Sequence, residues 1–463
     1  MSEQALQQTI VPDVATAAEP LEQPAAYVAE PEQAAAGHAP QADQPVYNAP
    51  PVFHDVPPED FTHVRPLPRV SIHAFCESDG VASIINAASK DRRMEKAHVK
   101  VQSGGVRGAV DFYQTTTTPN LIIVENHKDF DELMDELAGL AEVCDEGTNV
   151  VIIGHQNDVQ IYRELISQGI SEYLVAPVSM ADLMGVVSSL FVNPEAEPLG
   201  ASIAFIGAKG GVGSSTIAHN VAWAISDGFK SDVVLMDFDL AFGTANIDFD
   251  KDPPQGMAEA VYSSDRIDDT YLDRLLDKCS DHLSLLAAPS TLDREYDFGA
   301  EDFRQLMEVA QRGTPNVILD LPHVWTGWAK TTLLAADKVV ITATPDLASL
   351  RNTKNMVDLL NEARPNDEPP VLVLNQTDMP KRPEIAVDDF ASPLDLEPAI
   401  VLPFDPGLFG QAANNGQMIA EMDAKSDAAA SFETLAQILT GRREIKADAK
   451  KEKGSIFSFL KRK

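Results

Sequence analysis

Residues 207–216 read GAKGGVGSST, a glycine-rich stretch between two apolar segments. The run 202–206 before it suits a buried strand, and residues 217–225 after it have helical apolar spacing. Glycines between a strand and a helix let backbone N–H groups converge on an anion, and the positive end of the helix adds to the attraction. The stretch therefore predicts a phosphate-binding loop. Its expected binding residues are Gly210, Gly211, Val212, Gly213, Ser214, Ser215 and Thr216.

The loop departs from the common phosphate-loop pattern at one position. That pattern, G-x-x-x-x-G-K-[ST], places a lysine directly after the last glycine, where it neutralises the terminal phosphates. This chain has Ser214 there, and its own lysine, Lys209, lies early in the loop. Ser215 occupies the position of the hydroxyl that reaches Mg²⁺. A glycine-rich turn used only for tight packing is the alternative, but the flanking strand and helix favour nucleotide binding.

Carboxylates follow two further apolar runs that have the character of strands. Asp237 and Asp239 follow the run 232–236. Two carboxylates at i and i+2 suit a metal-bound or attacking water near phosphates, and a strand cap is the alternative. Asp320 ends the run 316–320, the pattern of a second carboxylate that orients Mg²⁺. Ligands of open α/β sheets bind outside the carboxyl ends of the strands, so these acids are expected at one site.

Composition and charge restrict the kinds of partner. The chain has 463 residues and a formal net charge of −35, so we expect no nucleic-acid partner, because a polyanion would be repelled. Its three cysteines lack metal-ligand spacing, which suits a reducing, cytoplasmic setting. The N-terminus lacks the apolar core of a secretory signal, and no apolar run is long enough to span a membrane. Any membrane contact is expected to be peripheral.

Changes of pattern along the chain predict five segments. Residues 1–66, rich in Ala, Pro, Gln and Glu, are expected to form a disordered acidic arm. Residues 67–193 alternate apolar strands with helices, and residues 201–441 do so again after a polar linker at 194–200. The predicted fold class is α/β, with two doubly wound parallel-sheet domains. Residues 442–463 form a basic tail.

The first alternating segment resembles a receiver domain of the flavodoxin-like class. Aspartyl phosphorylation needs a carboxylate nucleophile, Mg²⁺ held by further acids, and a lysine that balances the phosphate charge. Glu77 and Asp79 could supply the acidic pair. However, the third strand ends at Glu125, Gly154 follows the fourth strand, and Ala176 stands where the lysine is needed. We therefore expect a pseudo-receiver that serves docking or dimerisation.

The loop residues 209–216, together with Asp237-Phe238-Asp239 and Asp320-Leu321-Pro322, resemble the deviant-Walker ATPases of the MinD/ParA superfamily. The resemblance covers residues 201–440 and implies a P-loop NTPase fold. With a degenerate receiver in front and no second loop lysine, the chain looks most like the CpaE/TadZ proteins of Flp (tight-adherence) pilus assembly. The resemblance implies ATP and Mg²⁺ as cofactors and a homodimer that sandwiches the nucleotide.

The resemblance also implies roles for individual residues. Lys209 would reach across the dimer to the partner's nucleotide, Thr216 would help to hold the α-phosphate, and Asp239 would position water. Ser215 would coordinate Mg²⁺, and Asp320 would orient the metal through its hydration shell. Asp237 is expected to contribute to the metal site because it lies at a strand end, as argued above. The residues implied near the base are Asn375, Pro403 and Asp405.

The expected function is that of an ATP-binding, dimerising pilus-assembly factor that acts as a nucleotide switch at the cytoplasmic face of the membrane. Loss of one fixed charge on the phosphates costs about 2–4 kcal/mol of transition-state stabilisation, a slowing of roughly thirty- to a thousandfold. Any Mg²⁺-dependent ATPase activity should therefore be slow. The basic tail flanks the apolar cluster 454–460 and suits an anionic membrane surface or a protein of the pilus secretion machinery.

Two other functions remain as alternatives. The first is a protein scaffold in which the loop is vestigial, although the intact glycines, Ser215 and the strand-end acids argue against it. The second is a chromosome- or plasmid-partitioning ATPase. It would need a basic surface, and residues 201–440 contain no cluster of basic residues.

Overall fold

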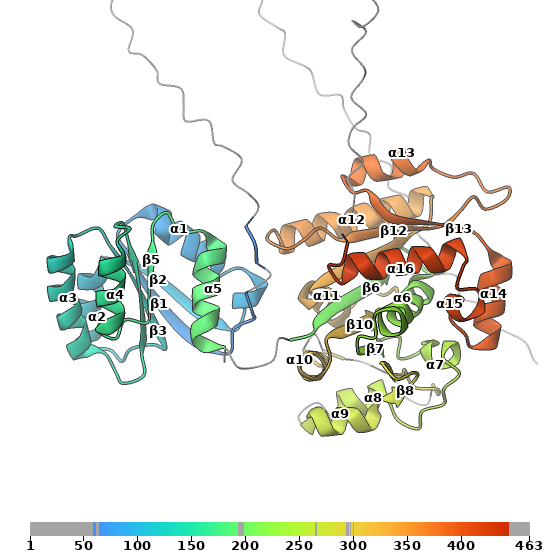
Figure 1. Ribbon diagram of the computed structural model, residues 1–463, viewed down its shortest axis with the longest axis horizontal. Coiled ribbons are helices and arrows are strands. Elements are labelled where there is room, and N and C mark those ends of the chain that lie inside the picture. The colour runs from blue at the N-terminus through green and yellow to red at the C-terminus, as the bar shows by residue number, and fades with distance from the viewer. Residues whose placement is uncertain are drawn as a thin grey trace, which may run out of the picture. The chain divides into compact units, whose positions relative to one another are not determined.

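A computed structural model describes residues 59–61, 64–192, 199–263, 266–292, 296, 298–299 and 301–443 (Figure 1). Most of the expected N-terminal arm, nearly all of the expected linker and most of the basic tail lie outside the described residues. Those three expectations, and the domain boundaries that depend on them, remain predictions.

The first sheet has five parallel strands in the order β2-β1-β3-β4-β5. This is the strand order of flavodoxin-like folds, in which the order reverses between β1 and β3. The strands are β1 (Val70–Cys76), β2 (Ala97–Ser103), β3 (Leu121–Asn126), β4 (Asn149–Gly154) and β5 (Glu172–Val175). The helices are α1 (Asp79–Ala88), α2 (Gly105–Tyr113), α3 (Phe130–Val143), α4 (Val159–Ser167) and α5 (Met180–Phe191).

Local sequence signals mark the starts of three of these helices. Ser78, Asp129 and Ser179 each cap a helix by accepting a backbone N–H with the side chain. The central strand β3 is buried along its whole length, so successive side chains enter cores on opposite faces of the sheet. Helices α1 and α5 cover one face, and α2, α3 and α4 cover the other (Figure 1).

The second sheet has eight strands in the order β13-β12-β11-β6-β10-β7-β9-β8. The strands are β6 (Ala201–Gly207), β7 (Val233–Asp237), β8 (Asp277–Lys278), β9 (Leu283–Leu286), β10 (Asn316–Asp320), β11 (Lys338–Ala343), β12 (Val371–Thr377) and β13 (Pro398–Pro403). The sheet is parallel except at one edge, where the two-residue strand β8 pairs antiparallel with β9. Four residues connect β8 to β9, which is too few for the crossover that a parallel pair requires.

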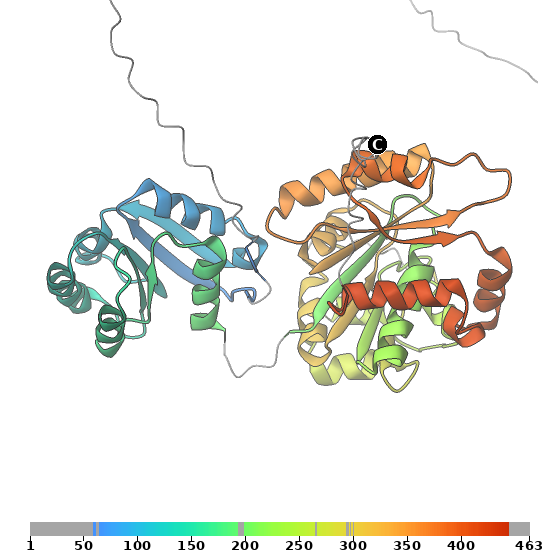
Figure 2. The same cartoon turned by 45° about the horizontal axis from the view of Figure 1, so that its top comes forward.

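Helices lie on both faces of this sheet (Figure 2). One apolar core packs α8 to α12 against the strands, and the other packs α6, α14 and α16 (Figure 1). The helices are α6 (Ser214–Trp223), α7 (Ala245–Asp248), α8 (Met257–Tyr262), α9 (Asp269–Leu275), α10 (Arg304–Gly313), α11 (Gly327–Ala335), α12 (Leu347–Ala363), α13 (Val387–Ala391), α14 (Pro406–Asn415), α15 (Ile419–Met422) and α16 (Asp427–Leu439). Among the described helices, none has the length and apolar character of a membrane span.

The α/β class and the two-sheet architecture predicted from the sequence are confirmed. The parallel strands β6, β7, β10, β11, β12 and β13 end at the same edge of the second sheet. The sequence analysis did not predict β8, β9 or the short helices α7 to α9, because their apolar segments are too short to show a clear period. The shared carboxyl edge is where the candidate site lies.

Candidate nucleotide site

The glycine-rich loop connects β6 to α6 and needs two glycines in left-handed backbone conformations. Gly211 has φ +80° and Gly213 has φ +87°, a region that other residues rarely adopt. A Cβ on Gly213 would lie 2.6 Å from Asn375 Nδ2, so even a methyl group would clash there. Gly210, in contrast, has no neighbouring atom within 4 Å of a built Cβ. The loop therefore depends on glycine at 213 for both its conformation and its packing.

Side chains from three other segments hold the loop carbonyls. His323 Nδ1 lies 2.9 Å from Gly207 O, which makes Nδ1 the donor, and Asn352 Nδ2 donates to Ala208 O at 2.8 Å. Gln376 Nε2 donates to Gly211 O at 3.0 Å, and Asn375 Nδ2 donates to Val212 O at 2.8 Å. These four donors come from the segment after β10, from α12 and from β12. With its carbonyls engaged outside, the loop has its N–H groups available for an anion.

Five buried side-chain polar atoms lack a hydrogen-bond partner among the described residues, and two of them belong to the loop and to the strand-end acids. These two are Ser214 Oγ, at the start of α6, and Asp320 Oδ1, at the end of β10. A buried hydroxyl or carboxylate oxygen without a partner is costly unless a ligand satisfies it. A phosphate oxygen and a hydrated Mg²⁺ would satisfy this hydroxyl and this carboxylate, respectively. The residues present therefore fit a Mg²⁺-nucleotide.

The acids at the ends of β7 and β10 occupy different environments. Asp320 and Asp237 are aligned on neighbouring strands. Asp237 Oδ1 accepts the Asp239 N–H at 3.0 Å, and its Oδ2 accepts the Ala245 N–H at 3.2 Å. Burial, reinforced by the negative charge of Asp320, raises the pKa of Asp237 to about 7. Asp239 Oδ1 in turn accepts the Phe242 N–H, so Asp237 at the end of β7 and Asp239 after it both organise the turn that follows.

His219 is a buried residue of the site that the sequence analysis missed. Its Nδ1 lies 2.8 Å from Asp248 Oδ2, and its Nε2 lies 3.3 Å from Asp320 Oδ2. Burial alone would lower the pKa of His219, but these two carboxylates outweigh it and raise the pKa to about 10. The imidazolium therefore joins α6 to the end of β10 and offsets part of the acidic charge there. Its position one helical turn after Ser215 was the available signal.

Lys209 forms an ion pair at the rim of the loop. Its Nζ lies 2.7 Å from Asp346 Oδ2, and the lysine side chain is 38% exposed. Burial would raise the pKa of Asp346, but hydrogen bonds from Lys209 and Thr344 lower it to about 2. Asp346 also caps α12 by accepting the Ser349 N–H. A lysine held at this partly exposed edge lies beside the loop and is accessible to a second molecule.

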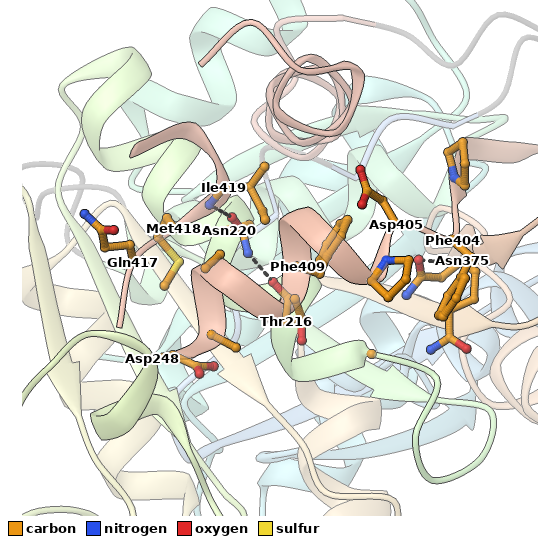
Figure 3. Close-up of a pocket in the computed structure, with 16 residues that line it drawn as sticks. Thr216, Asn220, Asp248, Asn375, Phe404, Asp405, Phe409, Gln417, Met418 and Ile419 are labelled. Atoms are coloured by element: carbon orange, nitrogen blue, oxygen red, sulfur yellow. Dashed lines mark hydrogen bonds between the residues drawn. The ribbon is translucent and has the colours of Figure 1, made fainter. Parts of the chain in front are cut away.

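The three residues expected near the base border one pocket with the loop (Figure 3). Asn375, Pro403 and Asp405 line a cavity of about 170 Å³ together with Gly213 and Thr216 of the loop and its helix. Further lining comes from α14 and from the segment before α15, including Phe409 and Met418. The pocket thus extends away from the phosphate loop between β12, β13 and α14.

Asn220 fixes one wall of this pocket. Its Nδ2 donates to Thr216 O at 2.8 Å, and its Oδ1 accepts the Ile419 N–H at 2.8 Å (Figure 3). Asp405 accepts the Leu408 N–H and thereby caps α14 on the opposite wall. The fold therefore brings together the loop, Asp320 and the pocket residues that the sequence analysis singled out, although they are far apart in the chain.

Comparison with known proteins finds different relatives for the two parts of the chain. No protein-family model matches the chain. The chain is 26% identical over 257 residues to the septum site-determining protein MinD of Bacillus subtilis, a match that covers 52% of this chain and 90% of MinD. The chain belongs to the MinD/ParA superfamily of P-loop ATPases.

Two solved structures extend this comparison. The ParA family ATPase from Chlorobium tepidum is 25% identical, with 51% of this chain and 98% of that chain covered and a TM-score of 0.47. The pilus assembly protein CpaE from Caulobacter crescentus is 42% identical, with 27% of this chain and 97% of that chain covered and a TM-score of 0.27. The N-terminal part of this chain is thus similar in sequence to CpaE proteins, and the MinD/ParA part follows it.

The residues that position the MinD/ParA loop were mostly absent from the sequence analysis. His323, Asn352 and Gln376 hold loop carbonyls, but no local pattern marks them. Asn375 was expected near the base, and the structure adds that its amide holds the loop. His323, Asn375 and Gln376 lie in or near strand ends, where polar residues have many uses, and Asn352 lies within α12. Only the packed sheet shows which of them face the loop.

We expect Gly213→Ala to destabilise the protein by about 1–3 kcal/mol, because alanine is strained at φ +87° and its methyl group would displace Asn375. Urea unfolding would measure the change, and ATP affinity should fall with it. Gly210→Ala is the matched control, since open space surrounds Gly210. Equal destabilisation by the two substitutions would contradict this account of the loop.

The buried His219 predicts a pH dependence of stability. Its folded pKa of about 10 exceeds the ordinary value of 6.5, so the folded state binds the extra proton between these values. The free energy of unfolding of nucleotide-free protein in EDTA should therefore fall between pH 7.5 and 10, with a His219 contribution of about 1.4 kcal/mol per pH unit. His219→Gln should remove this contribution, as urea unfolding at several pH values would reveal.

His282 provides the control for this pH experiment. It pairs with Asp232 at 2.7 Å, and both of their side chains are at least 35% exposed. His282→Gln should therefore leave the slope between pH 7.5 and 10 almost unchanged. Identical slopes in wild type and His219→Gln would show that the buried ion pairs do not hold the proton.

Proposed function

We propose that this chain is an ATP-binding, dimerising factor of pilus assembly that acts as a nucleotide switch with slow hydrolysis. The observation that carries the nucleotide part is the loop whose carbonyls are held by outside donors while Ser214 Oγ and Asp320 Oδ1 lack partners among the described residues. The pilus part is supported by the 42% identity of the N-terminal part to CpaE.

Each part of a Mg²⁺-ATP has candidate residues in the site. The N–H groups of the loop and of the first turn of α6 would hold the phosphates. Ser215 would bind Mg²⁺ directly, and Asp320 would orient its hydration shell. When bound, the metal neutralises charge that develops on the phosphates. Asp237, with both oxygens engaged by backbone N–H groups, would support the metal site by fixing the turn, and Asp239 would position a water.

The pocket beyond Thr216 suits a nucleoside. Its walls combine the apolar rings of Phe409 and Pro403 with the polar side chains of Asn375 and Asp405, as base-binding pockets do. The cavity begins at the loop, so a ligand that fills it and reaches the loop must carry both a base-like ring and phosphates. We infer a nucleoside triphosphate on this ground.

Exposed apolar side chains at the same edge of the sheet support a dimer. Phe242, Trp325 and Leu347 are 74%, 55% and 74% exposed, and each follows a strand that ends beside the loop. Exposed aromatic and aliphatic side chains grouped around a site favour a protein interface. A second copy of this chain would cover them and would bring its Lys209 towards the nucleotide.

The ion pair of Lys209 supports the proposed nucleotide switch. In the single chain this lysine pairs with Asp346, at the edge that a second copy would cover. Crossing to a partner's nucleotide would break this pair and replace it with a contact to phosphate. Dimerisation would thereby depend on the nucleotide, because without phosphate the lysine keeps its own carboxylate.

A protein scaffold with a vestigial loop is the alternative function, and Ser214 in place of lysine is the observation that favours it. A scaffold would bind no ATP at millimolar concentration. The partitioning ATPase remains the weaker alternative, because the chain carries a net charge of −35.

We place the protein at the cytoplasmic face of the membrane, with the basic tail as its candidate contact to lipid or to pilus secretion proteins. Residues 444–463 of that tail lie outside the described residues.

We expect Lys209→Ala to weaken ATP-dependent dimerisation by roughly thirtyfold, since a charge that pairs with phosphate across an interface is worth about 2 kcal/mol or more. Sedimentation velocity with and without Mg²⁺-ATP would measure it. Lys354→Ala is the control, because Lys354 pairs with Asp358 on α12. Dimers of equal strength in both variants would refute the nucleotide-sandwich arrangement.

The serine at position 214 leads to a prediction about the rate of ATP hydrolysis. Ser214→Lys should raise ATP hydrolysis by at least roughly thirtyfold, because the added charge would stabilise the transition state by about 2 kcal/mol or more. Ser214→Gln is the control, since it adds length without charge. ATP binding and melting temperature should be measured for both variants beside the hydrolysis rate. A folded, ATP-binding Ser214→Lys protein with unchanged turnover would show that the missing lysine does not limit hydrolysis.

A further inference from the structure

A second cluster of chemically capable side chains lies in the first sheet, away from the nucleotide residues in the chain. It consists of Glu77 after β1, Glu125 in β3, His127 after β3 and His155 after β4. All four lie at the carboxyl ends of parallel strands, near the point between β1 and β3 where the strand order reverses. Such switch points are the common ligand sites of doubly wound sheets.

Glu125 is a fixed and buried carboxylate at the centre of this cluster. Its Oε2 accepts the Glu77 N–H at 2.7 Å and the Ser78 N–H at 2.8 Å, and its Oε1 accepts from Ser78 Oγ at 2.6 Å. Burial alone would raise the pKa of Glu125, but these hydrogen bonds and one from His155 lower it. A carboxylate tied down in this way is poorly suited to act as a phosphate acceptor, and it presents a permanent negative charge to its neighbours.

Two histidines meet at one oxygen of this carboxylate. His155 Nε2 lies 3.2 Å from Glu125 Oε1, and His127 Nε2 lies 3.8 Å from the same atom. The two rings stack with centroids 3.8 Å apart and planes 23° from parallel. The donor atoms of the three side chains all lie within 4.8 Å of one another. The histidine side chains are 45% and 35% exposed, so a solute can reach them and they have room to turn.

Glu77 contacts the cluster through His127. Its Oε2 lies 2.9 Å from His127 Nδ1 and also accepts the His127 backbone N–H at 3.0 Å. A donor hydrogen on Nδ1 leaves Nε2 of His127 with a free lone pair directed towards the cluster. Gly105 leaves space for this carboxylate, because a Cβ there would lie 2.3 Å from Glu77 Oε1. Histidine ligands of metals are commonly oriented by such a carboxylate.

We propose that Glu125, His127 and His155 bind a divalent transition-metal ion of the Zn²⁺ class, with Glu77 orienting His127. Donors 2.0–2.1 Å from a tetrahedral Zn²⁺ are about 3.3 Å apart, close to the separations of 3.2 and 3.8 Å from Glu125 Oε1. A small rotation of the rings would point both nitrogens at one ion. Two imidazoles and one carboxylate favour Zn²⁺ over Mg²⁺, which prefers oxygen ligands. Three protein ligands leave a fourth position for water or a partner's side chain.

A metal-competition experiment on the full-length chain would test this site. Protein stripped with EDTA would be titrated with Zn²⁺ against a chromophoric chelator, and its melting temperature would be recorded with and without Zn²⁺. We expect one tight site per chain and a rise in melting temperature on Zn²⁺ addition. The double variant His127→Gln/His155→Gln should lose at least a hundredfold in affinity for that site and the rise in melting temperature.

Two further variants distinguish the loss of the metal site from general effects of substitution. Glu77→Gln should weaken Zn²⁺ binding by roughly ten- to a hundredfold, as expected for a residue that orients a ligand. His98→Gln, at an exposed position of β2, should bind Zn²⁺ like wild type. Zn²⁺ binding that persists at full strength in the folded double variant would overturn the proposal, as would a wild-type chain with no tight site. In either case the histidines would serve only as hydrogen-bond partners of Glu125.

Discussion

The N–H groups of a phosphate loop can face an anion only if the loop carbonyls find donors elsewhere. In this chain four side chains supply those donors, and they come from the segment after β10, from α12 and from β12. The conformation of the loop is therefore held by the rest of the second sheet, not by its own sequence alone. These four hydrogen bonds fix the directions of the loop carbonyls and leave the loop N–H groups to face the other way.

The charge distribution around the loop follows from the same sheet. Asp237 and Asp320 are brought side by side by the pairing of β7 with β10, and two neighbouring buried carboxylates repel each other. His219 relieves this repulsion from α6, while Lys209 stays outside at the rim with Asp346. The positive charges of His219 and Lys209 thus lie beside the loop, and position 214 carries no charge.

The first sheet repeats this principle with different side chains. Its carboxyl edge also collects polar residues, and there a buried glutamate and two histidines lie close together. The fold therefore offers two ligand edges with different preferences, one for phosphates and one for a metal that favours nitrogen.

The α/β class, the alternation of strands and helices over residues 67–193, the glycine-rich loop and the acids at strand ends could all be predicted from the sequence. These features depend on local periodicity and on glycine, which are visible within a few residues. The folded chain was needed to show that His323, Asn352 and Gln376 hold the loop. It was also needed to show that His219 lies between two carboxylates and that His127 and His155 meet at Glu125. Parallel strands joined by crossover helices bring together residues that are distant in the chain, so their spacing in the sequence carries no sign of contact.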